Sequence, residues 1–104
     1  MTAMAFTKVA TLAELEASPL LEVMVDGNPY ALCNIKGEIY ALNGTCPHQG
    51  GPLGQGFLSG STVTCPWHAW EFDCRTGAND LEPDDKVETY PVRVSGEDIL
   101  IDIA

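Results

Sequence analysis

The chain has few positive charges and no long apolar run. Five lysines and arginines stand against fifteen aspartates and glutamates, and the formal net charge is −10 at pH 7. This balance argues against nucleic acid and anionic membranes as partners and favours proteins with basic surfaces. No apolar stretch approaches the roughly 20 residues of a membrane span, and no charged-then-apolar leader opens the sequence. We therefore expect a cytoplasmic protein, monomeric and without a membrane anchor.

Charge is missing altogether from the middle of the sequence. Between Ile39 and Trp70 there is no aspartate, glutamate, lysine or arginine, although this stretch is rich in glycine and proline. Glycine and proline are typical of loops, and loops normally carry charge. An uncharged loop region predicts a partly buried polar group, whose properties a nearby charge would perturb.

Helical patterning is confined to one short segment. In "TLAELEASP", Thr11 can cap a helix, Glu14 can complete a capping box, and Ser18-Pro19 ends the helix. Most of the remaining sequence has the pattern of β-strands. "LEVMVDGNPYALCNIKGEIYAL" contains three runs separated by "DGN" and "KG", and two further runs flank "SGED". The expected fold is all-β, in one domain spanning residues 1–104.

Alternating residues in these runs mark the faces that we expect to be buried. The apolar positions of the four clearest faces are Leu21, Val23 and Val25; Ala31, Cys33 and Ile35; Val92 and Val94; and Ile99, Ile101 and Ile103.

Cysteine and histidine are scarce, but they occur together. Cys46-x-His48 is followed, after sixteen intervening residues, by Cys65-x-x-His68, and these are the only two histidines in the chain. In a cytosolic protein, cysteines at such spacing indicate metal ligation rather than disulfides. A thiolate and a neutral imidazole together suit zinc or an iron–sulfur cluster.

The distribution of the ligands favours iron over zinc. Structural zinc sites usually pair one cysteine with another at short spacing, whereas each pair here has one cysteine and one histidine. This suits a two-iron cluster with Cys46 and Cys65 on one iron and His48 and His68 on the other. A structural zinc site and a chance grouping of core residues remain as alternatives.

The two segments "CPHQGGPLG" and "CPWHAWEFDCRTG" resemble the ligand loops of the Rieske [2Fe–2S] family. The resemblance implies one [2Fe–2S] cluster per chain, held by Cys46, His48, Cys65 and His68. It also implies an antiparallel β-sandwich base with a small cluster-binding lobe, here about residues 43–75.

Two pairs of positions separate the branches of that family. Its high-potential respiratory members link the loops by a disulfide, and the matching positions here are Gly51 and Trp67. Those members also direct serine and tyrosine hydroxyls at the cluster, whereas this chain has Trp70 and Phe72. Fewer hydrogen-bond donors stabilise the reduced cluster less, so we expect a potential in the lower part of the family's range.

A chain with both histidines on the cluster has none left for the mononuclear iron of the family's oxygenases. We therefore expect an electron carrier rather than an enzyme. The chain resembles the ferredoxin component of multicomponent aromatic-ring dioxygenase systems, which receives electrons from a ferredoxin reductase and passes them to the terminal oxygenase. The alternative is a small Rieske-type subunit of an assimilatory nitrite reductase.

Several further residues of the two loops have two alternative roles each. Backbone N–H groups of Gln49, Gly50, Gly51 and Trp67 are expected to point at the cluster sulfurs, although glycines also simply permit tight turns. The residues proposed for an apolar rim around the cluster, with ordinary packing as the alternative, are Pro47, Pro52, Leu53, Pro66 and Trp67.

Two cysteines and one acidic segment complete the expectations. Cys33 is expected in the core, and Cys74 at a turn after the second loop; a disulfide between them is an open alternative that no pattern in the sequence supports. The acids proposed to steer a basic reductase or oxygenase surface, unless they merely solvate a loop, are Asp80, Glu82, Asp84, Asp85 and Glu88.

Overall fold

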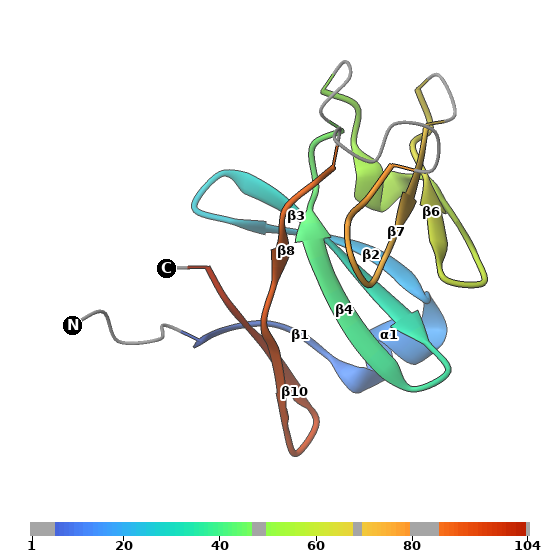
Figure 1. The fold of residues 1–104 in the computed structure, drawn as a ribbon. Coiled ribbons are helices and arrows are strands. Elements are labelled where there is room, and N and C mark those ends of the chain that lie inside the picture. Colours follow the sequence, from blue (N-terminus) through green and yellow to red (C-terminus); the bar gives the residue numbers. More distant parts are fainter. Residues whose placement is uncertain (1–5, 47–49, 68–69, 80–85, 104) are drawn as a thin grey trace.

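A computed structural model of the chain describes residues 6–46, 50–67, 70–79 and 86–103. These residues form three antiparallel sheets, which confirms the all-β expectation (Figure 1). No helix in these ranges is long and apolar enough to cross a membrane. The strands, in the order of each sheet, are β1 (Phe6–Thr11), β10 (Asp98–Asp102) and β9 (Val92–Ser95); β2 (Leu20–Val25), β3 (Asn28–Ile35), β4 (Glu38–Asn43) and β8 (Thr89–Tyr90); and β5 (Phe57–Ser59), β6 (Thr62–Thr64) and β7 (Glu71–Asp73).

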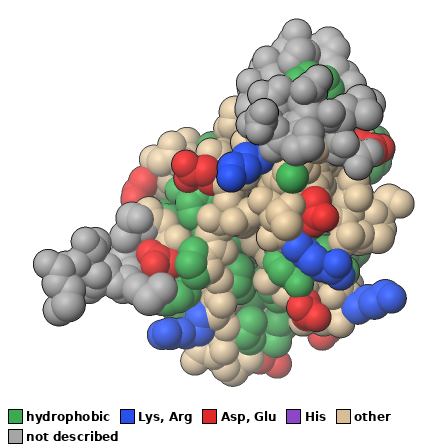
Figure 2. All heavy atoms as spheres, in the orientation of Figure 1, with side chains coloured by type: hydrophobic (Ala, Val, Ile, Leu, Met, Phe, Trp, Pro, Cys, Tyr) green, Lys and Arg blue, Asp and Glu red, His purple; other side chains and the backbone are tan. Residues whose placement is uncertain are grey.

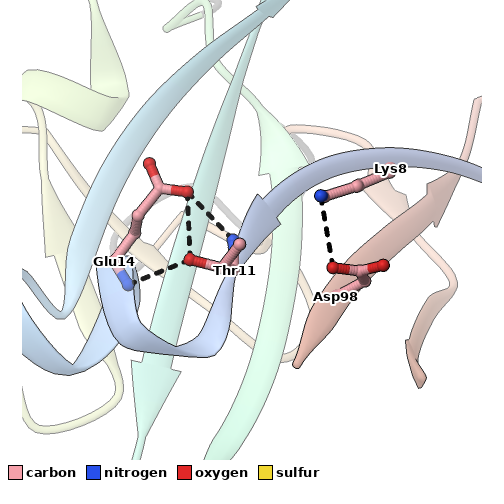
Figure 3. Close-up of polar contacts among 4 residues, drawn as sticks. All are labelled: Lys8, Thr11, Glu14 and Asp98. Atoms are coloured by element: carbon pink, nitrogen blue, oxygen red, sulfur yellow. Dashed lines mark hydrogen bonds and ion pairs between the residues drawn. The ribbon is translucent and has the colours of Figure 1, made fainter. Parts of the chain in front are cut away.

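The helix α1 (Leu12–Ala17) begins at the capping box that the sequence predicts (Figure 3). The Glu14 N–H donates to Oγ1 of Thr11 at 3.4 Å, and the Thr11 N–H donates to the Glu14 carboxylate at 3.0 Å. The Ser18 N–H donates to the Glu14 carbonyl, which ends the helix. Lys8 on β1 and Asp98 on β10 form an ion pair at 3.2 Å beside this corner.

The turns between the first strands of the second sheet are tight, as expected. Asp26 and Gly27 join β2 to β3, and Lys36 and Gly37 join β3 to β4; all four residues have positive φ, between 51° and 92°. Two consecutive residues with positive φ are the mark of a type I′ hairpin turn, whose twist matches that of the strands. The local sequence therefore sets the register of this meander.

Two hydrophobic cores share the second sheet. The sandwich core lies between the first and second sheets and includes Leu15, Leu32, Ile99 and Ile101, all fully buried. The other face of the second sheet carries the lobe, which consists of η1 (Leu53–Gln55) and the β5–β6–β7 sheet (Figure 1). The buried residues of this lobe core are Ala31, Cys33, Ile35, Leu42, Cys46, Leu53, Val63, Cys65, Phe72, Cys74 and Val87.

Most of the expected faces are buried, but the expectation for Val94 is wrong. Val92 packs against the sandwich core, whereas 46% of Val94 is exposed. Because β9 is the edge strand of its sheet, Val94 has a neighbouring strand on one side only and lies just before the hairpin turn. Alternation therefore indicated the correct face of β9 but not how far the core extends along it.

Candidate metal centre

The first cysteine loop leaves the end of β4. The Cys46 N–H donates to the Gly51 carbonyl at 2.9 Å, and the Gly50 N–H donates to the Cys46 carbonyl at 2.8 Å. Thr45 and Pro52 form an isolated antiparallel bridge at the base of the loop. These backbone bonds hold Gly50 and Gly51 against Cys46 at the start of the loop.

The second loop is closed in the same way. Cys65 follows β6, and its N–H donates to the Trp70 carbonyl at 2.8 Å. In both loops the N–H of the cysteine therefore bonds to the carbonyl of the residue five positions later, closing "CPHQGG" and "CPWHAW" alike. The sequence showed the two related motifs, but no residue pattern predicted this shared backbone hydrogen bond.

The side chains of Cys46 and Cys65 meet between the loops. Both are buried, with 2% and 1% of their surfaces exposed, and their thiols lie in hydrogen-bonding contact. Burial raises the pKa of the Cys65 thiol; a hydrogen bond from the Trp67 N–H opposes this shift, and the neighbouring Cys46 sulfur adds to it. Two buried thiols in contact with each other match two sulfur ligands of one tetrahedral metal ion.

Gly51 makes the close approach of the two loops possible. A methyl group at this position would lie 2.8 Å from Sγ of Cys65 and 3.0 Å from Cγ of Trp67. Cβ atoms essentially never approach another atom as closely as 2.8 Å, so a larger residue here would force the Cys65 side chain to move. The Trp67 ring thus lies against Gly51, at the two positions where the respiratory branch was expected to have a disulfide.

The expected donors of backbone hydrogen bonds are only partly as predicted. The Trp67 N–H does donate to the Cys65 sulfur. The Gly50 N–H instead donates to the Cys46 carbonyl, and its φ of 73° supports the tight-turn interpretation. Gln49 lies outside the described residues.

The other half of the predicted ligand set, His48 and His68, also lies outside the described residues. Within the described ranges, no group of three or more histidine, cysteine, aspartate or glutamate side chains could hold a metal ion. The described half nevertheless fits the predicted cluster: two buried, facing thiols, one of which accepts a backbone hydrogen bond that stabilises its thiolate form.

The apolar rim is smaller than expected. Pro66 and Trp67 are exposed beside the Cys65 sulfur, and half of the Trp67 surface is accessible. Leu53 does not belong to this rim, because it is fully buried in the lobe core, where its N–H donates to the Gly44 carbonyl. Pro52 is half-buried, and Pro47 lies outside the described residues.

Trp70 and Phe72 pack as predicted. Phe72 on β7 is fully buried, Trp70 packs against the lobe core, and their ring centroids are 6.4 Å apart. The lobe core also contains Cys33 on β3 and Cys74 directly after β7, both free thiols with no exposed surface. These positions confirm the predicted core role of Cys33 and the turn position of Cys74.

Known proteins resemble the chain over nearly its full length. It is 36% identical to the ferredoxin component of the naphthalene 1,2-dioxygenase system of Pseudomonas aeruginosa, over 89% of this chain and 90% of the relative. It is 42% identical to the 3-phenylpropionate/cinnamic acid dioxygenase ferredoxin subunit of Shigella boydii, over 91% of this chain and 88% of the relative.

Structural comparison agrees with these matches. The ferredoxin of carbazole 1,9a-dioxygenase from Nocardioides aromaticivorans superimposes with a TM-score of 0.84 at 32% identity, covering 94% of this chain and 97% of that one. Residues 5–91 match the Rieske [2Fe-2S] domain, a span that includes both cysteine loops, β1 and every strand of the second and third sheets. The chain therefore belongs to the Rieske [2Fe-2S] domain family.

Proposed function

We propose that the chain is the one-electron carrier of a multicomponent dioxygenase system, taking electrons from a reductase and passing them to a terminal oxygenase. The observation that carries this proposal is the facing thiol pair of Cys46 and Cys65, held at the junction of two loops in a lobe separate from the sandwich. Relatives that match the chain over most of its length are ferredoxin components of such systems.

The proposed ligands are Cys46 and Cys65 for one iron and His48 and His68 for the other. When bound, the [2Fe–2S] cluster takes up and releases one electron at a time. Two neutral imidazoles in place of two thiolates leave the oxidised centre without net charge, which raises the potential of such centres to about −150 to +300 mV. The cluster-binding lobe expected over about residues 43–75, within one domain of residues 1–104, belongs to the same proposal.

The surrounding residues hold the cysteines in place and adjust their electrostatics. The Trp67 N–H donates to the Cys65 sulfur and so favours the thiolate. Fully buried Phe72 and Leu53 close the lobe core beneath the loops and exclude water there. Trp70 and Phe72 have no hydroxyl to donate, so the potential should lie in the lower part of the range.

The carrier is proposed to perform no bond-making chemistry of its own. The chain has two histidines, and the proposed cluster uses both. None remains for a mononuclear iron site with two histidines and a carboxylate, so oxygen activation would take place on the oxygenase.

Basic docking surfaces on the reductase and oxygenase are part of the proposal, because acids outnumber bases fifteen to five. On the face drawn in Figure 2, acidic and basic side chains are interspersed over the sandwich. Of the five acids predicted to steer a partner, Glu88 is exposed; the other four lie outside the described residues. Steering would thus come from the net charge and the segment before Glu88 rather than from the visible face of the sandwich.

The nitrite reductase alternative is not favoured, because the relatives named above belong to dioxygenase systems. The expected cytoplasmic location and monomeric state stay predictions.

Two measurements on anaerobically purified protein test the proposal. Reduction with dithionite should produce the EPR signal of a histidine-ligated [2Fe–2S] cluster. Cys65→Ser should abolish this signal, whereas Cys33→Ala, which removes a buried thiol outside the loops, should retain it. Bound zinc without this signal would contradict the cluster assignment.

The carrier role itself is tested by stopped-flow mixing of the reduced protein with oxidised terminal oxygenases. The naphthalene, biphenyl and phenylpropionate systems supply a suitable panel. Rapid reoxidation by at least one oxygenase is expected. Failure with all of them, together with co-purification of a sirohaem protein, would favour the nitrite reductase alternative instead.

A further inference from the structure

Two cysteines that the proposed cluster does not use meet where the lobe is joined to the sandwich. Cys33 lies on β3 and faces the lobe, together with Ala31 and Ile35. Cys74 directly follows β7, and its N–H donates to the Ser61 carbonyl at 2.8 Å. Neither cysteine has any exposed surface, and both are free thiols.

The two thiols form a hydrogen-bonded pair with unequal partners. The hydrogen bond with Cys74 raises the pKa of the Cys33 thiol, and burial raises it further. The same hydrogen bond lowers the pKa of the Cys74 thiol, although burial opposes this shift. The shared hydrogen bond thus favours the thiol form of Cys33 and the thiolate form of Cys74. A thiolate is the reactive form of cysteine toward oxidants.

A surface cleft reaches Cys74, so this is the member of the pair that an entering oxidant meets first. The cleft has a volume of about 490 Å³ and lies between the β4–β8 edge of the second sheet and the turn after β7. Cys74 and Arg75 form one wall, and Tyr40 and Tyr90 contribute to the other. An oxidant as small as hydrogen peroxide can enter a space of this size, whose lining includes Cys74.

We propose that Cys33 and Cys74 are a two-cysteine oxidation site that converts to a disulfide with peroxide as the oxidant. The Cys74 thiolate attacks one peroxide oxygen, the O–O bond breaks, and hydroxide leaves; Cys74 becomes a sulfenic acid. The Cys33 sulfur then attacks the Cys74 sulfur, the new S–S bond forms, and water leaves with the Cys33 proton. Overall, two thiols and one hydrogen peroxide give one disulfide and two waters.

The product would add a covalent cross-link between the second sheet and the lobe. Cys33 belongs to the central region of the second sheet, whereas Cys74 belongs to the lobe. The disulfide would thus fix the lobe to the sandwich through two residues that belong to neither cysteine loop. This inference does not depend on which protein donates or receives electrons.

The experiment treats anaerobically purified holoprotein with one equivalent of hydrogen peroxide, then alkylates it under denaturing conditions and maps the peptides by mass spectrometry. The expected result is a loss of two alkylatable thiols, a mass decrease of about 2 Da, and a cross-linked peptide pair containing Cys33 and Cys74. The visible absorbance of the cluster, followed during the treatment, should persist.

Cys33→Ala and Cys74→Ala provide matched controls. Cys33→Ala should stop at a sulfenic acid on Cys74, trapped by dimedone, whereas Cys74→Ala should react far more slowly. A Cys46–Cys65 cross-link accompanied by loss of cluster absorbance would overturn the proposal, because it would place the oxidation at the loops. Recovery of both Cys33 and Cys74 as alkylated thiols from the peroxide-treated wild-type protein would also overturn the proposal.

Discussion

Gly51 in the first cysteine loop lies directly against Cys65 in the second, so close that a methyl group would stand 2.8 Å from the Cys65 sulfur. Each loop is closed by its own backbone hydrogen bond, from Cys46 to Gly51 and from Cys65 to Trp70. Closure shapes each loop separately, and the absence of a side chain at Gly51 lets the two closed loops come together.

Gly51→Ala should therefore impair the metal centre. The added methyl group must displace the Cys65 sulfur or the Trp67 ring, and overpacking of this kind costs about 1–3 kcal/mol of stability. We expect lower iron and sulfide content and several-fold faster loss of the visible cluster absorbance. Gly60→Ala is the control: its φ of 61° makes alanine unfavourable, but nothing lies within 4 Å of the new methyl group. It should lower the melting temperature without changing the iron content; equal iron content in both variants would contradict the explanation.

Two phenylalanines of the lobe should respond very differently to truncation. Phe72 on β7 is fully buried, and Phe72→Ala is expected to cost about 3–5 kcal/mol. Phe57 on β5 is 69% exposed, and Phe57→Ala should change stability by no more than about 0.5 kcal/mol. Urea unfolding of both variants measures the difference. Similar losses would show that Phe72 does not support the lobe core.

The capping box gives a test of the sandwich alone. Thr11→Ala removes the side-chain acceptor of the Glu14 N–H and should cost about 1 kcal/mol. For a domain of this size, that loss corresponds to a fall of about 4–8 °C in the melting temperature. Thr11→Ser retains the hydroxyl and should preserve most of the stability. The spectrum of the cluster should be the same in both variants, since the cap lies on the opposite side of the second sheet from the lobe.

Stability at high pH should depend on Tyr90. Burial raises the pKa of this phenol, and the charges of Glu88 and Tyr30 add to the shift. The rings of Tyr90 and Tyr30 pack edge to face, with their centroids 5.2 Å apart. The unfolded chain would lose this proton first, so the free energy of unfolding should fall as pH rises above about 10. Urea titrations at pH 8 and pH 10.5 measure this slope. Tyr90→Phe should make it shallower, and an unchanged slope would rule out Tyr90 as its source.

Electrostatic steering predicts that electron transfer slows as salt is added. Between 20 mM and 500 mM salt, the second-order rate with a basic partner should fall by about tenfold, because counterions screen the net charge of −10. Asp84→Asn with Asp85→Asn should reduce both the rate and its dependence on salt. Glu16→Gln with Glu97→Gln removes the same charge from exposed positions on the sandwich and should have a smaller effect. Equal effects of the two pairs would indicate that only net charge matters.

The sequence predicts best those features that a few neighbouring residues determine. The capping box of Thr11 and Glu14 and the tight turn at Asp26-Gly27 depend on local backbone geometry, and both are confirmed. Val94 was misjudged, and Leu53 follows the alternative of ordinary packing rather than the rim, because the burial of both residues depends on distant strands. Leu53 is covered by the lobe, and Val94 lies at an edge that leaves it open.

The same distinction holds at the metal centre. The spacing of the cysteines indicated that Cys46 and Cys65 belong together, and the structure brings their thiols into contact. The contact of Gly51 with Cys65 could not be predicted, because it arises only when two loops from different strands are packed on one core. The pairing of Cys33 with Cys74 had no support in the sequence for the same reason: these residues are 41 positions apart in the numbering and meet through tertiary packing alone.

The burial of β3 on both faces has a consequence for insertions and deletions. Leu32 points into the sandwich core and Cys33 into the lobe core, so successive residues of one strand belong to different cores. Removing or adding a single residue in the turn before β3 would exchange the two sets. Leucine would then replace cysteine beneath the lobe, and the sandwich would receive the smaller side chain. The length of the β2–β3 turn is therefore constrained as strictly as the cysteine motifs, although the turn residues Asp26 and Gly27 belong to neither motif.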